Sequence, residues 1–240
     1  MSAPGSSAAS DQSSGAQFVF HQQSRADIES VFRFEDYPLN RMQFAHVACI
    51  VDIGAHCAAF SYLCATRYPN AQIRAFEPLQ INYDLAAQNM RPFANVELRR
   101  YGLSDYDGAT DVFYSPAFGF AASSSVKTHD HTDGFERVII RRASAELSDL
   151  GHITILKVDT EGHEYRILHD MSGLLDKISS IFVEVHSDLD RKRIDALLGD
   201  TFVLFYTRCN MTNRYKAAYV NRRDLESGQI KVATAPELRP

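Results

Sequence analysis

Residues 49–60, CIVDIGAHCAAF, decide the fold. An apolar run ends in Asp-Ile-Gly, and small residues then lead into a second apolar run, which is typical of a strand that turns into a helix. We predict a buried strand over 46–53 and a helix over 58–68 that ends before Pro69. Gly54 is the only glycine of this turn, whereas the loop that binds a dinucleotide carries three. The turn therefore disfavours a nicotinamide-dinucleotide oxidoreductase.

The alternation of strands and helices continues along the chain. Further strands are predicted over 71–77, 95–103, 152–159 and 178–187, and further helices over 81–90, 164–171 and 190–198. Consecutive strands joined by helices pair in parallel through right-handed crossovers. Two last strands, 202–209 and 215–223, flank Asn-Met-Thr-Asn and read as an antiparallel hairpin. The fold class is α/β: a doubly wound, mostly parallel, seven-stranded Rossmann-like sheet that ends in this hairpin.

One domain is expected from a chain of 240 residues with 45% hydrophobic residues. The Ser/Ala/Gly-rich residues 1–17 are predicted to be a flexible tail, and 18–240 a single domain. Within that domain, 18–44 is predicted to be a helical segment. Residues 111–142 interrupt the alternation and are predicted to be an inserted loop or hairpin on the substrate side.

Charge and composition limit the partners. The net charge of -5 disfavours nucleic acid and anionic membrane surfaces as partners. The N-terminus lacks the apolar stretch of a secretory signal, and no run reaches the roughly 20 apolar residues of a membrane span. The four cysteines show no Cys-x-x-Cys spacing and read as thiols of a reducing compartment. We therefore predict a cytoplasmic protein; its oligomeric state has no signal in the sequence.

Each of the first five predicted strands carries polar or acidic residues at its carboxyl end or in the turn directly after it. They are Asp52 with Gly54, Ala55 and His56; Glu77 with Pro78; Ser104 with Asp105; Asp159 with Glu161 and Glu164; and Glu184 with His186. The carboxyl ends of parallel strands line one crevice, so we expect these residues to lie together. Any single one could merely end a strand or cap a helix, but their occurrence at five strand ends favours a site.

The first two strand ends indicate a nucleoside. Glu77 follows Asp52 by 77 − 52 = 25 residues, near the spacing of about 20 for the carboxylate that binds ribose hydroxyls. The side chains of His56, Cys57 and Ala58 would crowd a diphosphate. A nucleoside that carries an amino acid in place of phosphates, S-adenosylmethionine, suits such a loop.

These motifs together resemble the FkbM-type family of class I S-adenosylmethionine-dependent methyltransferases. The family pattern is Asp-x-Gly-Ala-Asn-x-Gly, Phe-Glu-Pro, Ser-Asp, Lys-x-Asp-x-Glu-Gly-x-Glu and Glu-x-His. The chain supplies DIGAHCA, FEP, LSD, LKVDTEGHE and VEVH in that order over 47–186. It departs from the pattern at His56, where the family has Asn, and at Ala58, where it has Gly.

The resemblance implies the cofactor contacts. The amino acid part would contact Asp52, Gly54, Ala55 and His56; the ribose would contact Glu77 beside Pro78; Ser104 and Asp105 would flank the adenine; and Asp159 would lie near the sulfonium methyl. A nearby carboxylate would stabilise that cation through short-range electrostatics.

His186 is predicted to be the general base, since a histidine near its ordinary pKa of about 6.5 accepts a proton at neutral pH. Glu184 or Asp159 would orient it or bind substrate. The alternative, a structural histidine at a strand end, stays open. No metal is predicted: Mg²⁺ would suit these carboxylates, but Lys157 opposes a nearby positive charge.

The methyl acceptor is predicted to be a small molecule or a peptide. The resemblance implies O-methylation of a hydroxyl on a sugar or secondary metabolite. N-methylation of a peptide amide and a non-catalytic binding module that retains the fold are the alternatives.

Overall fold

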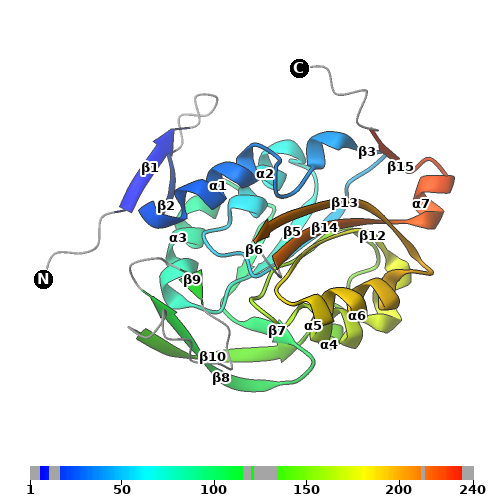
Figure 1. Cartoon of the computed structure of the whole chain (residues 1–240). Coiled ribbons are helices and arrows are strands. Elements are labelled where there is room, and N and C mark those ends of the chain that lie inside the picture. The colour runs from blue at the N-terminus through cyan, green and yellow to red at the C-terminus, as the bar shows by residue number, and fades with distance from the viewer. Residues whose placement is uncertain (1–5, 11–16, 116–119, 122–133, 212–213, 234–240) are drawn as a thin grey trace, which may run out of the picture.

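A seven-stranded sheet runs through the centre of the protein (Figure 1). This computed structural model describes residues 6–10, 17–115, 120–121, 134–211 and 214–233. From edge to edge the strands are β13 (Phe202–Met211), β14 (Arg214–Asn221), β12 (Ile178–Val185), β11 (Ile153–Val158), β4 (Cys49–Ile53), β5 (Gln72–Phe76) and β6 (Val96–Arg99). Five of them pair in parallel, and β14 is antiparallel to both of its neighbours. The predicted doubly wound sheet and its C-terminal hairpin are confirmed.

The strand order reverses between β4 and β11. From β4 the chain moves outward through β5 to β6, and it returns on the other side of β4 as β11 and then β12. Loops after the strands on the two sides of this point diverge, which leaves a crevice at the carboxyl ends of the strands.

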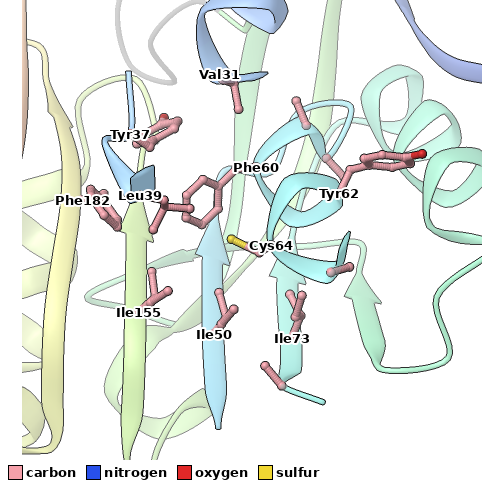
Figure 2. Close-up of a cluster of buried hydrophobic side chains, with 14 of the residues drawn as sticks. Val31, Tyr37, Leu39, Ile50, Phe60, Tyr62, Cys64, Ile73, Ile155 and Phe182 are labelled. Atoms are coloured by element: carbon pink, nitrogen blue, oxygen red, sulfur yellow. The ribbon is translucent and has the colours of Figure 1, made fainter. Parts of the chain in front are cut away.

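Helices cover both faces of the sheet (Figure 1). The helices are α1 (Arg25–Phe32), α2 (Ala59–Arg67), α3 (Gln80–Met90), α4 (Ala143–Glu146), α5 (Glu164–Asp170), α6 (Asp188–Leu198) and α7 (Arg222–Glu226), with 3-10 turns η1 (Gln22–Ser24), η2 (Leu39–Arg41) and η3 (Ser172–Lys177). Side chains alternate across a strand, so Ile50 faces the core under α1, α2 and α3, while Val51 faces the core over α4, α5 and α6. Figure 2 shows the first core, in which Phe60 packs beside Tyr37 and Phe182.

A second, four-stranded sheet has the order β7 (Gly102–Ser104), β10 (Gly134–Arg142), β8 (Gly108–Ser115) and β9 (Phe120–Ala121). The single strand predicted over 95–103 is wrong, because β6 ends at Arg99 and β7 pairs with β10 instead of with the central sheet. A Cβ at Gly102 would lie 2.9 Å from Ile140 Cδ1, so a glycine permits this pairing. Strands β8 and β10 form an antiparallel hairpin in the predicted insertion; residues 116–119 and 122–133 lie outside the described residues.

The N-terminal part differs from the prediction. Only α1 is an α-helix within 18–44, because β2 (Gln17–His21) buries Phe18 and Phe20 and β3 (Met42–Phe44) pairs with β15 (Ile230–Val232). In the predicted flexible tail, β1 (Ser6–Ser10) pairs antiparallel with β2, and residues 1–5 and 11–16 lie outside the described ranges. Among the described residues, no helix has the length and apolar character needed to cross a membrane.

Candidate active site

A cavity of about 1040 Å³ opens where the strand order reverses, beyond the carboxyl ends of β4, β5, β11 and β12. Of the residues that the sequence places at the strand ends, the wall contains Gly54, Ala55, His56, Glu77, Pro78, Asp159, Glu161 and Glu184. The remaining five, Asp52, Ser104, Asp105, Glu164 and His186, do not line it. The structure thus brings most of the predicted residues together in one crevice.

The turn after β4 needs its glycine for two reasons. Gly54 has φ +79°, and a Cβ there would lie 1.7 Å from the carbonyl oxygen of Asp159. His56 and Ala58 also have positive φ, 53° and 65°. These are the two positions at which the family pattern has Asn and Gly, the residues that adopt the left-handed region most readily. The chain therefore adopts the left-handed conformation at both positions with less suitable residues.

Glu77 connects the turn after β4 to the turn after β5. Its Oε2 accepts a hydrogen bond from the backbone N–H of His56 at 2.8 Å, and its Oε1 accepts one from Leu79 N at 3.0 Å. Burial raises the pKa of Glu77 to about 7, against the effect of these two donors. Because each carboxylate oxygen can accept more than one hydrogen bond, Glu77 can also accept hydrogen bonds from hydroxyl groups of a ligand in the cavity.

Asp52 supports the turn from behind the cavity wall. Its side chain is fully buried; Oδ1 accepts from Lys157 Nζ at 3.0 Å and Oδ2 from Ser61 Oγ at 2.7 Å. The same Lys157 ammonium donates to the carbonyl oxygen of Gly54 at 2.7 Å. Asp52 therefore acts on the loop through Lys157 and has no face on the cavity.

Ser104 and Asp105 lie behind the opposite wall. Ser104 Oγ is 2.9 Å from His163 Nδ1, and Asp105 Oδ1 accepts from Arg166 Nε at 2.9 Å. Neighbouring residues of the second sheet form the wall itself: Gly102, Leu103, Val112 and Ile140. This mostly apolar surface is suited to a flat base, and Ser104 and Asp105 hold the chain that presents it.

His186 lies between carboxylates. Its Nδ1 is 3.1 Å from Glu164 Oε1 and its Nε2 is 3.1 Å from Glu161 Oε2. Burial alone would lower the pKa of His186, but the two carboxylates outweigh it and raise that pKa to about 11. A ring that is already protonated at neutral pH and does not line the cavity is a poor proton acceptor, so this geometry argues against His186 as the general base.

The conformation of the turn between β11 and α5 sets the directions of the Glu161 and Glu164 side chains. Glu164 Oε1 accepts from the backbone N–H of Thr160 and of Gly162, both at 3.0 Å. Glu161 between them has φ 55°, a conformation that costs a non-glycine residue about 1–2 kcal/mol. Glu164 and His186 together hold Glu161 in this conformation, and its carboxylate faces the cavity beside Arg214, at 3.4 Å.

Sequence reasoning missed Asp36, Tyr37 and Lys216. The hydroxyl of Tyr37 donates to Asp159 Oδ2 at 3.1 Å. Lys216 Nζ donates to Asp36 Oδ2 at 2.6 Å and lies 3.0 Å from Glu184 Oε2. Asp36 and Tyr37 come from the segment before β3, far from the other site residues in sequence, so no local pattern reveals them. Lys216 could have been suspected, because it is a charged residue beside the apolar run AAYV of the hairpin.

The carboxylates considered for Mg²⁺ are compensated by cations of the chain itself. Ligand atoms of Asp159, Glu161 and His186 lie within 4.8 Å of one another. Lys157 Nζ is 3.9 Å from Asp159 Oδ2, and Arg214 is paired with Glu161. These ion pairs supply the positive charge that a metal ion would otherwise bring.

The strand order, with antiparallel β14 next to β12, and the cavity at the reversal point define a class I methyltransferase fold. Among solved structures, the chain is similar to one titled a fibrillarin/Nop5p complex, with a TM-score of 0.53 and 10% identity over 86% of this chain and 88% of that one. It is also similar to a putative rRNA methylase from Clostridium thermocellum, with a TM-score of 0.50 and 8% identity over 80% and 95%. At such identities the likeness concerns the fold alone.

The family follows from the sequence. The family model of the methyltransferase FkbM domain matches residues 52–215, and the chain belongs to this family of methyltransferases. The hexuronic acid methyltransferase AglP of Haloferax volcanii is 28% identical over 72% of this chain and 69% of its own length. The methyltransferase sdnD of Sordaria araneosa is 27% identical over 63% of this chain, and the AMB antimetabolite synthetase AmbE of Pseudomonas aeruginosa 28% over 71%. The aligned part spans 55% of sdnD and 8% of AmbE.

Proposed function

We propose that this enzyme transfers the methyl group of S-adenosylmethionine to a hydroxyl group of a small molecule such as a sugar or secondary metabolite. The observation that carries the proposal is the cavity at the reversal point, in which the one-glycine turn after β4 and the carboxylate of Glu77 share one wall. S-adenosylmethionine supplies an activated methyl group on a cationic sulfur.

The residues of the wall suit this cofactor. Asn82 is 2% exposed and lines the cavity beside Glu77, and its Nδ2 donates to Glu77 Oε1 at 3.4 Å. A carboxamide offers both an acceptor and a donor, so it suits a ribose hydroxyl or an adenine amino group. Glu77 and Asn82 would hold the nucleoside, and the backbone around Gly54 would hold the amino acid part.

Asp159 would face the positive end of the cofactor. Burial acts to raise the pKa of Asp159, but Lys157 and Lys216 outweigh it and hold that pKa below its usual range. Asp159 is therefore ionised, and the hydroxyl of Tyr37 fixes its position. A fixed negative charge in a cavity of low dielectric stabilises a nearby sulfonium more strongly than water does.

The chain's contribution to methyl transfer is alignment and exclusion of water. In-line displacement needs the acceptor oxygen, the methyl carbon and the sulfur on one line. A cavity of about 1040 Å³ is at the upper end of ligand pockets and can hold the cofactor with a small acceptor. Its wall carries eight Asp and Glu against five Lys and Arg residues, and this excess of acidic groups suits a neutral or weakly charged acceptor better than a polyanion such as nucleic acid.

A sugar is the first acceptor to test, because AglP is named as a hexuronic acid methyltransferase. The protein would be incubated with methyl-labelled S-adenosylmethionine and a panel of methyl β-D-glucuronide, neutral glycosides, hydroxylated polyketides and dipeptide amides. Release of S-adenosylhomocysteine together with a methyl ether in the product's NMR spectrum is the expected result. A methylated amide would favour N-methylation instead, and no turnover together with no cofactor binding would favour the non-catalytic module.

A further inference from the structure

We propose that Glu184 is the general base that removes the proton from the acceptor hydroxyl, and that Lys216 positions its carboxylate. This inference rests on the proposed methyl transfer. It assigns to Glu184 the step for which the sequence pattern favours His186.

The sheet places Glu184 beside Asp159 and opposite Lys216. Strand β12 pairs with β11 so that Val183 lies opposite Val158, which places the next residues, Glu184 and Asp159, beside each other at the carboxyl ends of the strands. Both line the cavity. On its other side, β12 pairs with β14, and Glu184 lies directly opposite Lys216. The base would therefore sit next to the carboxylate that faces the sulfonium.

Lys216 holds one oxygen of Glu184, and the other lies on the side of His186. Lys216 Nζ lies 3.0 Å from Oε2, and Asp36 fixes the ammonium from behind. Oε1 lies 3.8 Å from His186 Nε2, beyond hydrogen-bond distance. The side chain of Glu184 is 13% exposed and lines the cavity.

Three other carboxylates at the ends of the strands, Asp159, Glu161 and Glu77, are less suited to the task. Asp159 accepts from Tyr37, and its pKa is held below the usual range, which makes it a weak base. Glu161 is shared between His186 and Arg214. Glu77 accepts backbone hydrogen bonds at the nucleoside end of the cavity.

The groups around Glu184 bring its pKa close to neutral pH. Four groups interact with Glu184 directly: Asp159, Lys216, His186 and Tyr37. Further charged residues line the same cavity, among them Asp27 of α1, Asp36, Lys157, Glu161, Arg208 and Arg214. Burial and the charge of Asp159 raise the pKa of Glu184 to about 7, against the opposing effect of Lys216. A base is most effective when its pKa lies near the working pH.

The step balances without a further reactant. The acceptor O–H bond breaks and its proton goes to the Glu184 carboxylate, while the oxygen forms a bond to the methyl carbon. The bond from that carbon to the cofactor sulfur breaks, and its electron pair stays on sulfur. The products are a methyl ether and neutral S-adenosylhomocysteine, and the carboxylic acid of Glu184 later releases the proton to water.

The first test compares kcat as a function of pH for the wild type, Glu184→Gln and the exposed control Glu226→Gln, with methyl β-D-glucuronide as the probe. We expect Glu184→Gln to keep its affinity for S-adenosylhomocysteine, to lose about 10²–10⁴-fold in kcat and to lose the rise in rate centred near pH 7. Glu226→Gln should match the wild type. A kcat of Glu184→Gln within threefold of the wild type, with the same pH profile, would overturn the proposal.

A second test needs no acceptor. Carbon-13 NMR of the glutamate carboxyl carbons, compared with Glu184→Gln, gives the pKa of Glu184 in the complex with S-adenosylhomocysteine. A midpoint near 7 that rises in Lys216→Gln and returns in Lys216→Arg supports the positioning role. A midpoint near the ordinary 4.5 would refute the proposed base even where methyl transfer is intact. Absence of both cofactor binding and turnover in the wild type would instead refute the proposed function.

Discussion

Replacing Gly54 with Ala tests the view that one glycine holds the cofactor turn against the end of β11. The new Cβ would lie 1.7 Å from the carbonyl oxygen of Asp159, and contacts of real Cβ atoms stay above 3.0 Å. The two backbones must therefore separate by about 1.3 Å (3.0 − 1.7), which disturbs the hydrogen bond from Lys157 Nζ to the carbonyl oxygen of Gly54. The positive φ costs about 1–2 kcal/mol, and overpacking adds about 1–3 kcal/mol. We expect a loss of about 2–5 kcal/mol in the free energy of unfolding.

Substitutions at two other glycines separate the cost of the positive φ from the cost of the steric clash. Gly228 has φ +75°, and no atom of the described residues lies within 4 Å of a methyl group added there, so Gly228→Ala should cost only the backbone term of about 1–2 kcal/mol. Gly173 has the same open space without a positive φ, so Gly173→Ala should be neutral or stabilising by up to about 1 kcal/mol. Urea unfolding measures all three, and calorimetry with S-adenosylhomocysteine shows whether Gly54→Ala alone loses binding. A cost of Gly54→Ala equal to that of Gly228→Ala would refute the reasoning.

Three further variants test the charges around the cavity. Lys157→Met should lower the free energy of unfolding by about 3–5 kcal/mol, because it leaves the buried Asp52 uncompensated, and adding Asp52→Asn should restore part of that loss in urea unfolding; no recovery would contradict the pairing. The pKa of His186 is raised from 6.5 to about 11. The contribution of its ion pairs to the free energy of unfolding is therefore fully present below pH 6.5 and is lost as the pH rises toward 11. The stability gap between the wild type and His186→Gln should therefore narrow over that range, and a constant gap would exclude the proposed ion pairs. Tyr37→Phe removes a hydrogen bond to the carboxylate of Asp159 and should cost about 1.5–3 kcal/mol in the same assay, while an unchanged midpoint would show that the bond is not formed in solution.

The fold was predictable because its signals are local. Apolar runs such as 46–53 and 152–159 are long enough to be read as buried strands, and the turn after each carries its polar residues at the carboxyl end. The division of 95–103 was not predictable, because the choice of partner for β7 depends on β10, which follows some 30 residues later. Pairing over such distances leaves no pattern in the strand itself.

The site was predictable in position and less so in roles. Strand ends identified Gly54, Glu77, Asp159 and Glu184 as parts of one wall. The ordinary pKa of histidine suggested His186 as the base, but that pKa depends on two carboxylates that the turn after β11 directs toward it. Asp52 is fully buried within β4 and does not line the cavity, and only its contact with Lys157 shows how its charge is compensated.

The assignment of this cavity to S-adenosylmethionine is tested most directly by a calorimetric titration with S-adenosylhomocysteine. We expect saturable one-to-one binding by the wild type, unchanged in Glu226→Gln and at least tenfold weaker in Glu77→Ala, because Glu77 joins the two turns that form the nucleoside wall. No binding by the wild type, or equal binding by Glu77→Ala, would contradict the account.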